Sequence, residues 1–554
     1  MNLQDLRKKA IFLLVGLLCF SFFGCINFYQ RNVQDAMTFQ DEAFVGEEGW
    51  YQFIKSTAEI KPILNLFSDG LVYEANDYRF DGNDLMATLS LAPVANFTIP
   101  DKKNFRRGLI PEAERAGLLS TLTLAVKNPL KEGAVKINLA DIANLTYFDK
   151  NEALTIITSS GITIGSIVVG GAIFLAIACN CPRVYALNPA GEKIPQGSLL
   201  SGAIFQSLER EDVLMLEHVQ AQNGQIQLMV ANELPEREYL DQLQLQSIKV
   251  PAGYQLAYGT GDAELLAFGE AIAPVAAEGA LGQDILVQVR QTDEHTYNFG
   301  ERTYQESLNE ATFTFDKSQL KGQTGYLIME GKQSTWLEEV AEYFFQQFGT
   351  DFDQWMGKMD EFPREKYDEN AAKRGMSMTA YLETAAGWEK IGTYHNAGIV
   401  REKIMAMPVD LSKVQGQQVR IKLSSAFNFW EVNQLSLSTD LANLPAPQTH
   451  SLLSATNQDG EDVMELLQNR DQQYYLQPSE GDYIKLNFAV PQEAGLTYLL
   501  KGSGYYHHER SYTHAPQKKA LRKMKFYGPL ITHDLSLALH QLSMQSKALA
   551  VQQP

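Results

Sequence analysis

Hydrophobic and polar residues alternate along much of this chain, which predicts β-strands with one buried and one solvated face. Ile226, Leu228 and Val230 are spaced by two, and the same alternation recurs in Val419-Arg-Ile-Lys-Leu423 and Ile484-Lys-Leu-Asn-Phe488. Turn residues separate these runs, as is typical of antiparallel sandwiches. We therefore expect a mainly β fold built from antiparallel β-sandwich-like domains.

Two stretches change to a helical period, and they predict an α-helical insert. Trp336, Val340, Phe344 and Phe348 lie on one helical face. A second face is predicted by the residues Met378, Tyr381, Leu382, Ala385 and Trp388. A further helix is predicted near the C-terminus, at 534–551.

These patterns divide the chain into seven parts. From the N-terminus they are a lipoprotein-type signal at 1–24, a small β-rich domain at 26–150, an apolar membrane-associated segment at 154–181, a β-rich domain at 182–330, the helical insert at 331–394, a β-sandwich-like domain at 395–515, and a basic linker with the C-terminal helix at 516–554. Within the fourth part, Ile285–Val289 is a predicted strand.

The first apolar run is typical of an export signal. Arg7-Lys8-Lys9 precedes an uncharged run that extends to Phe28, and a basic segment before an apolar one marks a secretory signal. Gly24-Cys25 resembles the end of a bacterial lipoprotein signal, so Cys25 is the predicted lipidation site. Two other interpretations stay open, an uncleaved membrane anchor of about 19 residues and a buried helix.

The second apolar run predicts a transmembrane or membrane-inserted helix. Between Glu152 and Arg183 there is no charged residue, and 19 residues in a helix rise about 28 Å, close to the hydrocarbon thickness of a bilayer. Gly161, Gly165 and Gly170 would form a helix-packing face. A buried helix or β-hairpin is the alternative, and the side of the membrane occupied by residues 183–554 stays open.

Charge excludes one large class of partner. The formal net charge is −19, which argues against nucleic-acid binding because that relies on basic residues facing phosphates. One cluster departs from this background and offers a possible anionic-surface patch: Lys518, Lys519, Arg522, Lys523 and Lys525. It would contact lipid headgroups or an acidic partner, and a solvated linker is the alternative.

Three common catalytic or ligand-binding motifs are absent from the sequence. There is no HExxH, and His507, His508 and His514 have the wrong spacing for one helical face. Gly259-Thr-Gly261 lacks the third glycine of a dinucleotide-binding loop, and the acidic turn near Asp459 lacks the ligands of a calcium loop. The sequence therefore predicts no catalytic residue, no metal and no cofactor.

Abundant carboxylates leave one enzymatic alternative open. Paired acids can hydrolyse glycosidic bonds, and tryptophans can serve as sugar platforms. The candidate acids are Glu209, Glu211, Asp212, Glu217, Glu233, Glu236 and Glu238, and the candidate platforms are Trp336, Trp355, Trp388 and Trp430. With 66 acidic residues, pairs also arise by chance.

Several segments together resemble a family of bacterial cell-envelope proteins and lipoproteins, mostly from Bacteroidota-like lineages. They include Cys181-Pro-Arg-Val-Tyr185, Ala231-Asn-Glu-Leu-Pro235, Asp482-Tyr-Ile-Lys-Leu486 and Tyr498-Leu-Leu-Lys-Gly-Ser-Gly504. The resemblance covers about residues 135–510. It implies a multidomain, membrane-associated chain, and it brings no assigned activity.

The leading functional hypothesis is a membrane-anchored protein of the bacterial cell envelope with a non-catalytic binding or assembly role. Its expected partners are membrane lipid, through the anchor and the apolar helix, and an envelope protein. The alternatives are an envelope glycoside hydrolase with paired carboxylates and a structural subunit of a membrane protein complex.

Overall fold

The computed structural model describes two compact units, which are treated separately below. The first comprises Met1–Gly171, and the second comprises Ala172–Thr303 with Ser307–Pro554. The described residues are 28–35, 63–68, 71–81, 84–92, 104–106, 121–138, 141–151 and 182–521 with gaps at 220, 294, 302–307, 396 and 519–520, together with 532–533, 535–537 and 539–540.

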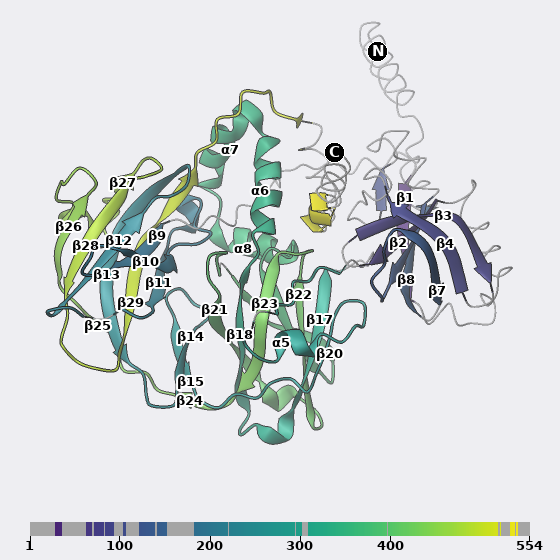
Figure 1. Ribbon diagram of the computed structural model, residues 1–554, viewed down its shortest axis with the longest axis horizontal. Coiled ribbons are helices and arrows are strands. Elements are labelled where there is room, and N and C mark those ends of the chain that lie inside the picture. Colours follow the sequence, from purple (N-terminus) through teal and green to yellow (C-terminus); the bar gives the residue numbers. More distant parts are fainter. Residues whose placement is uncertain are drawn as a thin grey trace, which may run out of the picture. The chain divides into compact units, whose positions relative to one another are not determined.

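The first unit contains one eight-stranded sheet in the order β5-β1-β8-β6-β2-β3-β4-β7. Figure 1 labels β1 to β4, β7 and β8 of this sheet. Its strands are β1 (Phe28–Asp35), β2 (Ile63–Ser68), β3 (Leu71–Asp81), β4 (Asp84–Leu91), β5 (Asn104–Arg106), β6 (Thr121–Val126), β7 (Gly133–Asn138) and β8 (Ile142–Asn151). Leu64, Leu66, Leu85 and Leu124 belong to its buried core. Strands β2 and β6 pair in parallel, and the other pairs are antiparallel.

The second unit begins and ends with the same sandwich, here called the first sandwich. One sheet has the order β10-β9-β12-β28-β26, and the other has the order β11-β29-β13-β25 with β27 beside β13. The strands are β9 (Arg183–Leu187), β10 (Lys193–Ser198), β11 (Arg210–Leu216), β12 (Gln225–Ala231), β13 (Glu236–Lys249), β25 (Gln448–Thr449), β26 (Leu452–Asn457), β27 (Tyr475–Gln477), β28 (Tyr483–Ala489) and β29 (Leu496–His508).

A second sandwich, here called the inserted sandwich, occupies the chain between β13 and β25. Its sheets have the orders β23-β18-β21-β14-β15-β24 and β16-β17-β22-β19-β20. The strands are β14 (Gln255–Tyr258), β15 (Leu265–Phe268), β16 (Ala276–Glu278), β17 (Asn309–Asp316), β18 (Thr324–Gln333), β19 (Met378–Thr384), β20 (Gly387–Tyr394), β21 (Lys403–Asp410), β22 (Gln418–Ser425), β23 (Trp430–Ser438) and β24 (Leu441–Ala442).

This topology joins strands that sequence patterning assigns to separate ranges. Strand β12 of the 182–330 range pairs with β28 of the 395–515 range over seven residue pairs, from Gln225↔Ala489 to Ala231↔Tyr483. Strand β13 pairs with β29 in the same way. The expectation of a mainly β protein with several antiparallel sheets is confirmed.

Three helices follow β18, and an aromatic cluster anchors them. They are α6 (Trp336–Gln346), α7 (Phe352–Met359) and α8 (Arg364–Lys373). Trp355 of α7 stacks on Phe348 with ring centroids 4.5 Å apart. Its indole also meets the ring of Phe205, from the first sandwich, edge-on at 5.6 Å. The helices therefore pack against both sandwiches (Figure 1).

Two local predictions are wrong. The second predicted helical face belongs to strands β19 and β20, which form a hairpin in which Glu383 pairs with Trp388. The apolar spacing that suggested a helix combines residues from both faces of the hairpin, because Leu382 faces the core while Tyr381 faces outward. Ile285–Val289 contains the short helix α5 (Leu286–Val289), whose first amide donates to the Asp284 carboxylate at 2.9 Å.

The predicted membrane segments lie outside the described residues. This applies to the signal at 1–24, to Cys25 and to the apolar stretch at 154–181. Within the part of the chain that the structure describes, no helix is long and apolar enough to cross a membrane. At the C-terminus, the described residues between 532 and 540 are helical, and 541–554 are not described.

Replacing Trp355 with alanine tests the aromatic cluster. Trp355 is 8% exposed, and truncating a core tryptophan to alanine costs about 3–5 kcal/mol. We expect Trp355→Ala to lower the free energy of unfolding by that amount in urea denaturation followed by circular dichroism. The matched control is Tyr343→Ala on α6, whose side chain is 36% exposed, with an expected change within about 0.5 kcal/mol. Equal losses in both variants would contradict the assigned role.

Candidate functional site

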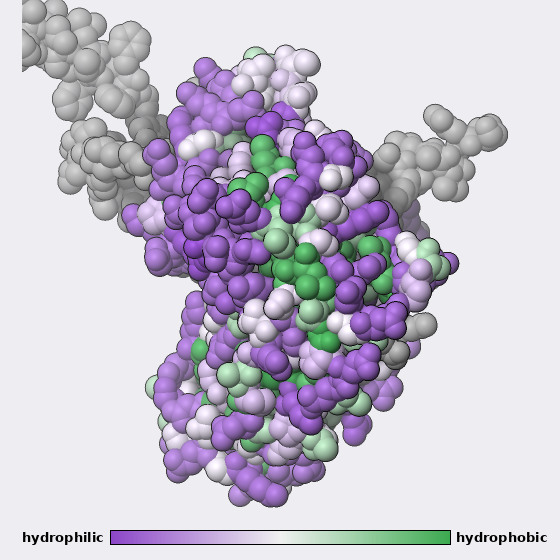
Figure 2. Space-filling view, turned by 90° about the vertical axis from the view of Figure 1, so that its left-hand side faces the viewer, coloured by the Kyte–Doolittle hydropathy of each residue, from purple (hydrophilic) through white to green (hydrophobic). Residues whose placement is uncertain are grey.

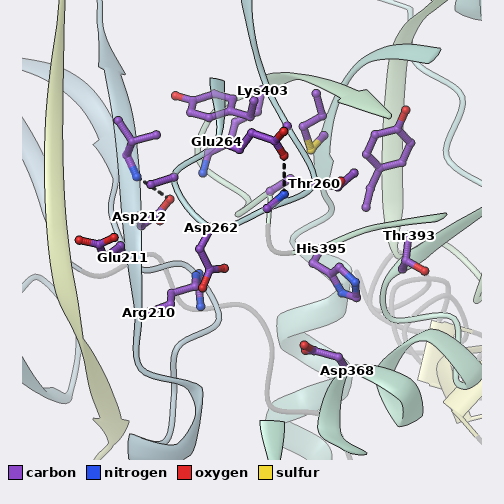
Figure 3. Close-up of a pocket in the computed structure, with 18 of the residues that line it drawn as sticks. Arg210, Glu211, Asp212, Thr260, Asp262, Glu264, Asp368, Thr393, His395 and Lys403 are labelled. Carbon is purple, nitrogen blue, oxygen red and sulfur yellow. Dashed lines mark hydrogen bonds between the residues drawn. The ribbon is translucent and has the colours of Figure 1, made fainter. Parts of the chain in front are cut away.

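Two adjoining cavities lie where the first sandwich meets the inserted sandwich. The smaller has a volume of about 210 Å³, and the larger has a volume of about 680 Å³. Both are lined by Tyr258, Ala397 and Lys403. The first sandwich supplies β11, whereas the inserted sandwich supplies β14, β21 and the end of β20 (Figure 3). We call the pair the junction cavities.

Strand β11 supplies a charged wall whose side chains are held by backbone groups. The Asp212 carboxylate accepts hydrogen bonds from the amides of Leu200, at 2.8 Å, and Val213, at 2.9 Å. The Arg210 guanidinium, 7% exposed, donates to the carbonyl of Ser201. In Figure 3, Arg210 and Asp212 lie on the side of the smaller cavity opposite His395 and Thr393. Both charges are therefore fixed in direction.

Lys403 and Tyr258 form the boundary between the junction cavities. The Lys403 ammonium lies 5.2 Å from the centroid of the Tyr258 ring, a cation–π distance. The Tyr258 hydroxyl accepts a hydrogen bond from the Met215 amide at 2.9 Å, which ties β14 to the edge strand β11. Burial raises the pKa of Tyr258, so the phenol stays neutral.

Lys403 is a half-buried cation without a carboxylate partner among the described residues. Burial lowers the pKa of its ammonium, the charge of Asp212 opposes this shift, and the charge of Arg210 reinforces it. Desolvation disfavours a charged amine that lacks a counter-ion. The ammonium therefore has unused capacity to bind an anion.

An ion pair closes the far side of the smaller cavity. Arg364 of α8 donates two hydrogen bonds to Asp262, both at 2.6 Å. Burial acts to raise the pKa of Asp262, but the hydrogen bond and charge of Arg364 lower it overall. Asp368 lies 3.6 Å from the Arg364 Nε. The pair fixes the loop between β14 and β15 to the helical insert.

His395 is the other titratable group at this end. Its Nδ1 lies 3.0 Å from the Ser377 hydroxyl. Burial lowers the pKa of His395, while the charge of Asp368 acts in the opposite direction. Ser377 is 1% exposed and does not line the cavity. The serine therefore positions the imidazole and is not accessible as a nucleophile.

The larger cavity combines an apolar wall with a polar rim. The wall consists of Leu214, Met215, Leu216, Val250, Leu256, Val400 and Ile404. Arg401 is ion-paired with Glu217, and Lys332 lies 3.4 Å from a partner carboxylate on Glu431. Of the three cations that line this cavity, Lys403 alone has no ion pair with a described residue. Ligand cavities of this size are mostly apolar with a few placed polar groups.

Most residues singled out from the sequence do not meet here. Those outside the described residues are Cys25, Gly161, Gly165, Gly170, Lys519, Arg522, Lys523 and Lys525. Lys518 is exposed. His507 is paired with Asp360 and His508 with Glu236, so the three histidines form no common site. No group of metal-binding side chains occurs among the described residues.

The candidate acids mostly have structural partners. Glu211 pairs with Lys501 at 2.7 Å, and Glu233 accepts from the Tyr185 hydroxyl at 2.6 Å. Glu209 accepts from Tyr474 at 2.7 Å. Asp212 is one of two that line the smaller cavity. No tryptophan lines either cavity, so neither of these two cavities places a pair of acids beside a tryptophan.

Sequence reasoning missed Lys403 and Tyr258. Lys403 is the first residue of β21 and precedes the apolar run Ile404–Val409. A charged residue at the end of a strand is common, so the sequence carries no signal for a special role. The segment Gly259-Thr-Gly261 drew attention as a fragment of a nucleotide-binding loop, and it does line the smaller cavity. Its actual role is a tight turn, in which the Glu264 carboxylate accepts from the Gly261 amide at 2.9 Å.

The lowered pKa of Lys403 has a measurable consequence for stability. Between the folded-state pKa and the ordinary value of 10.5, the unfolded chain binds more protons, so stability rises with pH in that window. We expect the difference in unfolding free energy between wild type and Lys403→Met to shift in favour of wild type as pH rises from 7 towards 10. Parallel pH profiles in urea titrations would contradict this.

Comparison with known proteins does not link this fold to an activity. A scan against protein-family models finds no match for the chain, and a search of curated proteins finds no match either. The proposed ligand therefore rests on the geometry of the junction cavities.

Proposed function

We propose that this protein is a membrane-anchored component of the bacterial cell envelope that binds a small amphipathic carboxylate in the larger junction cavity, without catalysis. Lys403 carries this proposal. Its ammonium is half-buried, has no described carboxylate partner and faces both cavities. A bound carboxylate would supply the missing counter-ion, and such charge-assisted hydrogen bonds are among the stronger ones in proteins.

The rest of the larger cavity supports the same ligand. Seven apolar side chains form its wall, and burial of hydrocarbon against them is favourable by about 25 cal/mol per Å². The three acids that line this cavity already have partners. Glu217 pairs with Arg401, Glu330 accepts from the Thr292 hydroxyl, and Glu402 accepts from the Asn433 side-chain amide at 2.9 Å. A monocarboxylate with a hydrocarbon tail matches one unpaired cation beside an apolar wall.

The glycoside-hydrolase alternative has less support. Glu211 and Asp262 are neutralised by Lys501 and Arg364. Asp212 accepts from two backbone amides, one at each carboxylate oxygen, so both of its oxygens already have partners.

The anchor is proposed from the N-terminal sequence. Arg7-Lys8-Lys9, the apolar run and Gly24-Cys25 support export and lipidation at Cys25. The apolar run at 154–181 supports a further membrane contact. An envelope location would also provide amphipathic carboxylates as available ligands.

Calorimetric titration tests the ligand. We expect decanoate to bind wild type, and decyltrimethylammonium of equal chain length not to bind. Hydrogen bonds to charged groups contribute about 1.5–3 kcal/mol, so Lys403→Met should weaken decanoate binding by about 10–100-fold. The matched control Lys321→Met, at an exposed lysine, should retain wild-type affinity. Equal binding of both amphiphiles, or full affinity in Lys403→Met, would overturn the assignment.

Substitution of Cys25 tests the anchor. Because lipidation needs the thiol, we expect Cys25→Ser to lose incorporation of radiolabelled palmitate. The variant should also be released from membranes or change its electrophoretic mobility. Membrane attachment and mobility that stay unchanged in Cys25→Ser would rule out the lipoprotein assignment.

A further inference from the structure

The outer face of the sheet β16-β17-β22-β19-β20 carries an exposed tryptophan, Trp388, that is not part of the hydrophobic core. In this sheet Leu382 and Ile421 are fully buried, so their strand neighbours face outward. The outward side chains of the last three strands are Tyr381, Glu383, Trp388, Lys390, Arg420 and Lys422. This face is separate from the junction cavities.

The indole of Trp388 lies across the sheet. Trp388 is on the edge strand β20, and β22 is two strands away, beyond β19. Nevertheless the Lys422 ammonium is 4.9 Å and the Arg420 guanidinium carbon 5.6 Å from the indole centroid. Neighbouring strands are about 4.8 Å apart, so the ring must reach over β19 towards β22. One ring face then rests on cations while the other faces solvent.

Two ion pairs hold the cations beside the ring in place. Lys422, whose side chain is 14% exposed, contacts Glu310 at 3.0 Å. Its ammonium also lies 5.1 Å from the Tyr381 ring. Arg420 Nη1 donates to both oxygens of Glu383 at 2.8 Å. Lys422 is the more desolvated of the two cations, and a cation–π contact contributes more when it is desolvated. The ion pairs fix both cations, so the platform is preorganised.

Trp388 is nevertheless accessible. It is 36% exposed, whereas Trp355 and Trp430 are 8% and 0% exposed, and the Trp336 indole donates to the Ser536 hydroxyl at 2.7 Å. Lys390 pairs in register with Tyr381 on the same face. It is exposed and has no ion pair with a described residue. The unpaired charge beside the ring is therefore positive.

The chemistry of this face selects a sugar over other ligands. The axial C–H bonds of a pyranose pack on an exposed aromatic ring, while its hydroxyl groups bond to flanking charged side chains. A cationic ligand is disfavoured because Lys422 and Arg420 already occupy the inner ring face. A protein partner fits less well because Lys and Glu are depleted in the cores of protein interfaces, and Glu383, Lys390 and Lys422 make up half of this face.

We propose that this face binds a glycan of carboxylated pyranose units, with one sugar ring stacked on Trp388 and its carboxylate paired with Lys390. The inference is independent of the junction cavities, since no residue is shared between the two sites. In this proposal the same ligand contacts the indole of Trp388 and the ammonium of Lys390.

Calorimetry with two defined oligosaccharides tests the proposal. Tetragalacturonate is the acidic probe and cellotetraose the neutral one. We expect wild type to bind tetragalacturonate at least tenfold more tightly than cellotetraose. Trp388→Ala should reduce tetragalacturonate affinity at least tenfold. The control Tyr343→Ala, at an aromatic residue of equal 36% exposure, should bind as wild type does.

Lys390→Ala separates charge recognition from stacking. It should abolish the preference for tetragalacturonate and its dependence on salt, while Lys321→Ala changes neither. Circular dichroism spectra of all variants establish that they are folded. Absence of binding by folded wild type, equal affinity for both probes, or full affinity in Trp388→Ala would each overturn the proposal.

Discussion

The contact between Trp355 and Phe205 sets the geometry on which the rest of the second unit depends. Phe205 belongs to the first sandwich and Trp355 to a helix of the insertion, and their rings meet edge-on. Phe344, Phe345, Phe348 and Phe352 surround the same indole. Hydrogen bonds follow at the end of α7, where the Gln206 amide donates to Asp360 at 2.9 Å. Such close-packed aromatic contacts lock two sandwiches together because they tolerate little displacement.

The junction cavities are a consequence of that docking. Strand β11 is an edge of the first sandwich, and an unpaired edge is usually covered or charged. Here the Met215 amide donates to Tyr258, so the inserted sandwich covers part of the edge. Lys403 is left half-buried beneath this cover, and its lowered pKa follows from the desolvation. A cation that the fold keeps without an ion-pair partner is what the proposed carboxylate ligand would neutralise.

Strand alternation explains the second proposed site in the same physical terms. In the hairpin of β19 and β20, Leu382 faces the core and Tyr381 faces outward. Residues adjacent in sequence therefore lie on opposite faces of the sheet, one in the core and one at the proposed site. The outward row places Trp388 over Lys422 and Arg420, two strands away. No helical arrangement of residues 378–388 would bring the indole to those cations. The hairpin of β19 and β20 therefore explains both why the helix prediction was wrong and why the sequence did not reveal the proposed site at Trp388.

The sequence by itself determined the strand-rich character, the individual strands with clean alternation such as 226–230, 419–423 and 484–488, and helix α6, because local periodicity reports which side of an element is buried. It did not determine that β12 pairs with β28, some 250 residues later, because strand pairing depends on contacts that no local pattern encodes. It also left Lys403 and Trp388 without a role. Their environments are made by β11, β14 and β22, and only the tertiary structure brings those strands beside them.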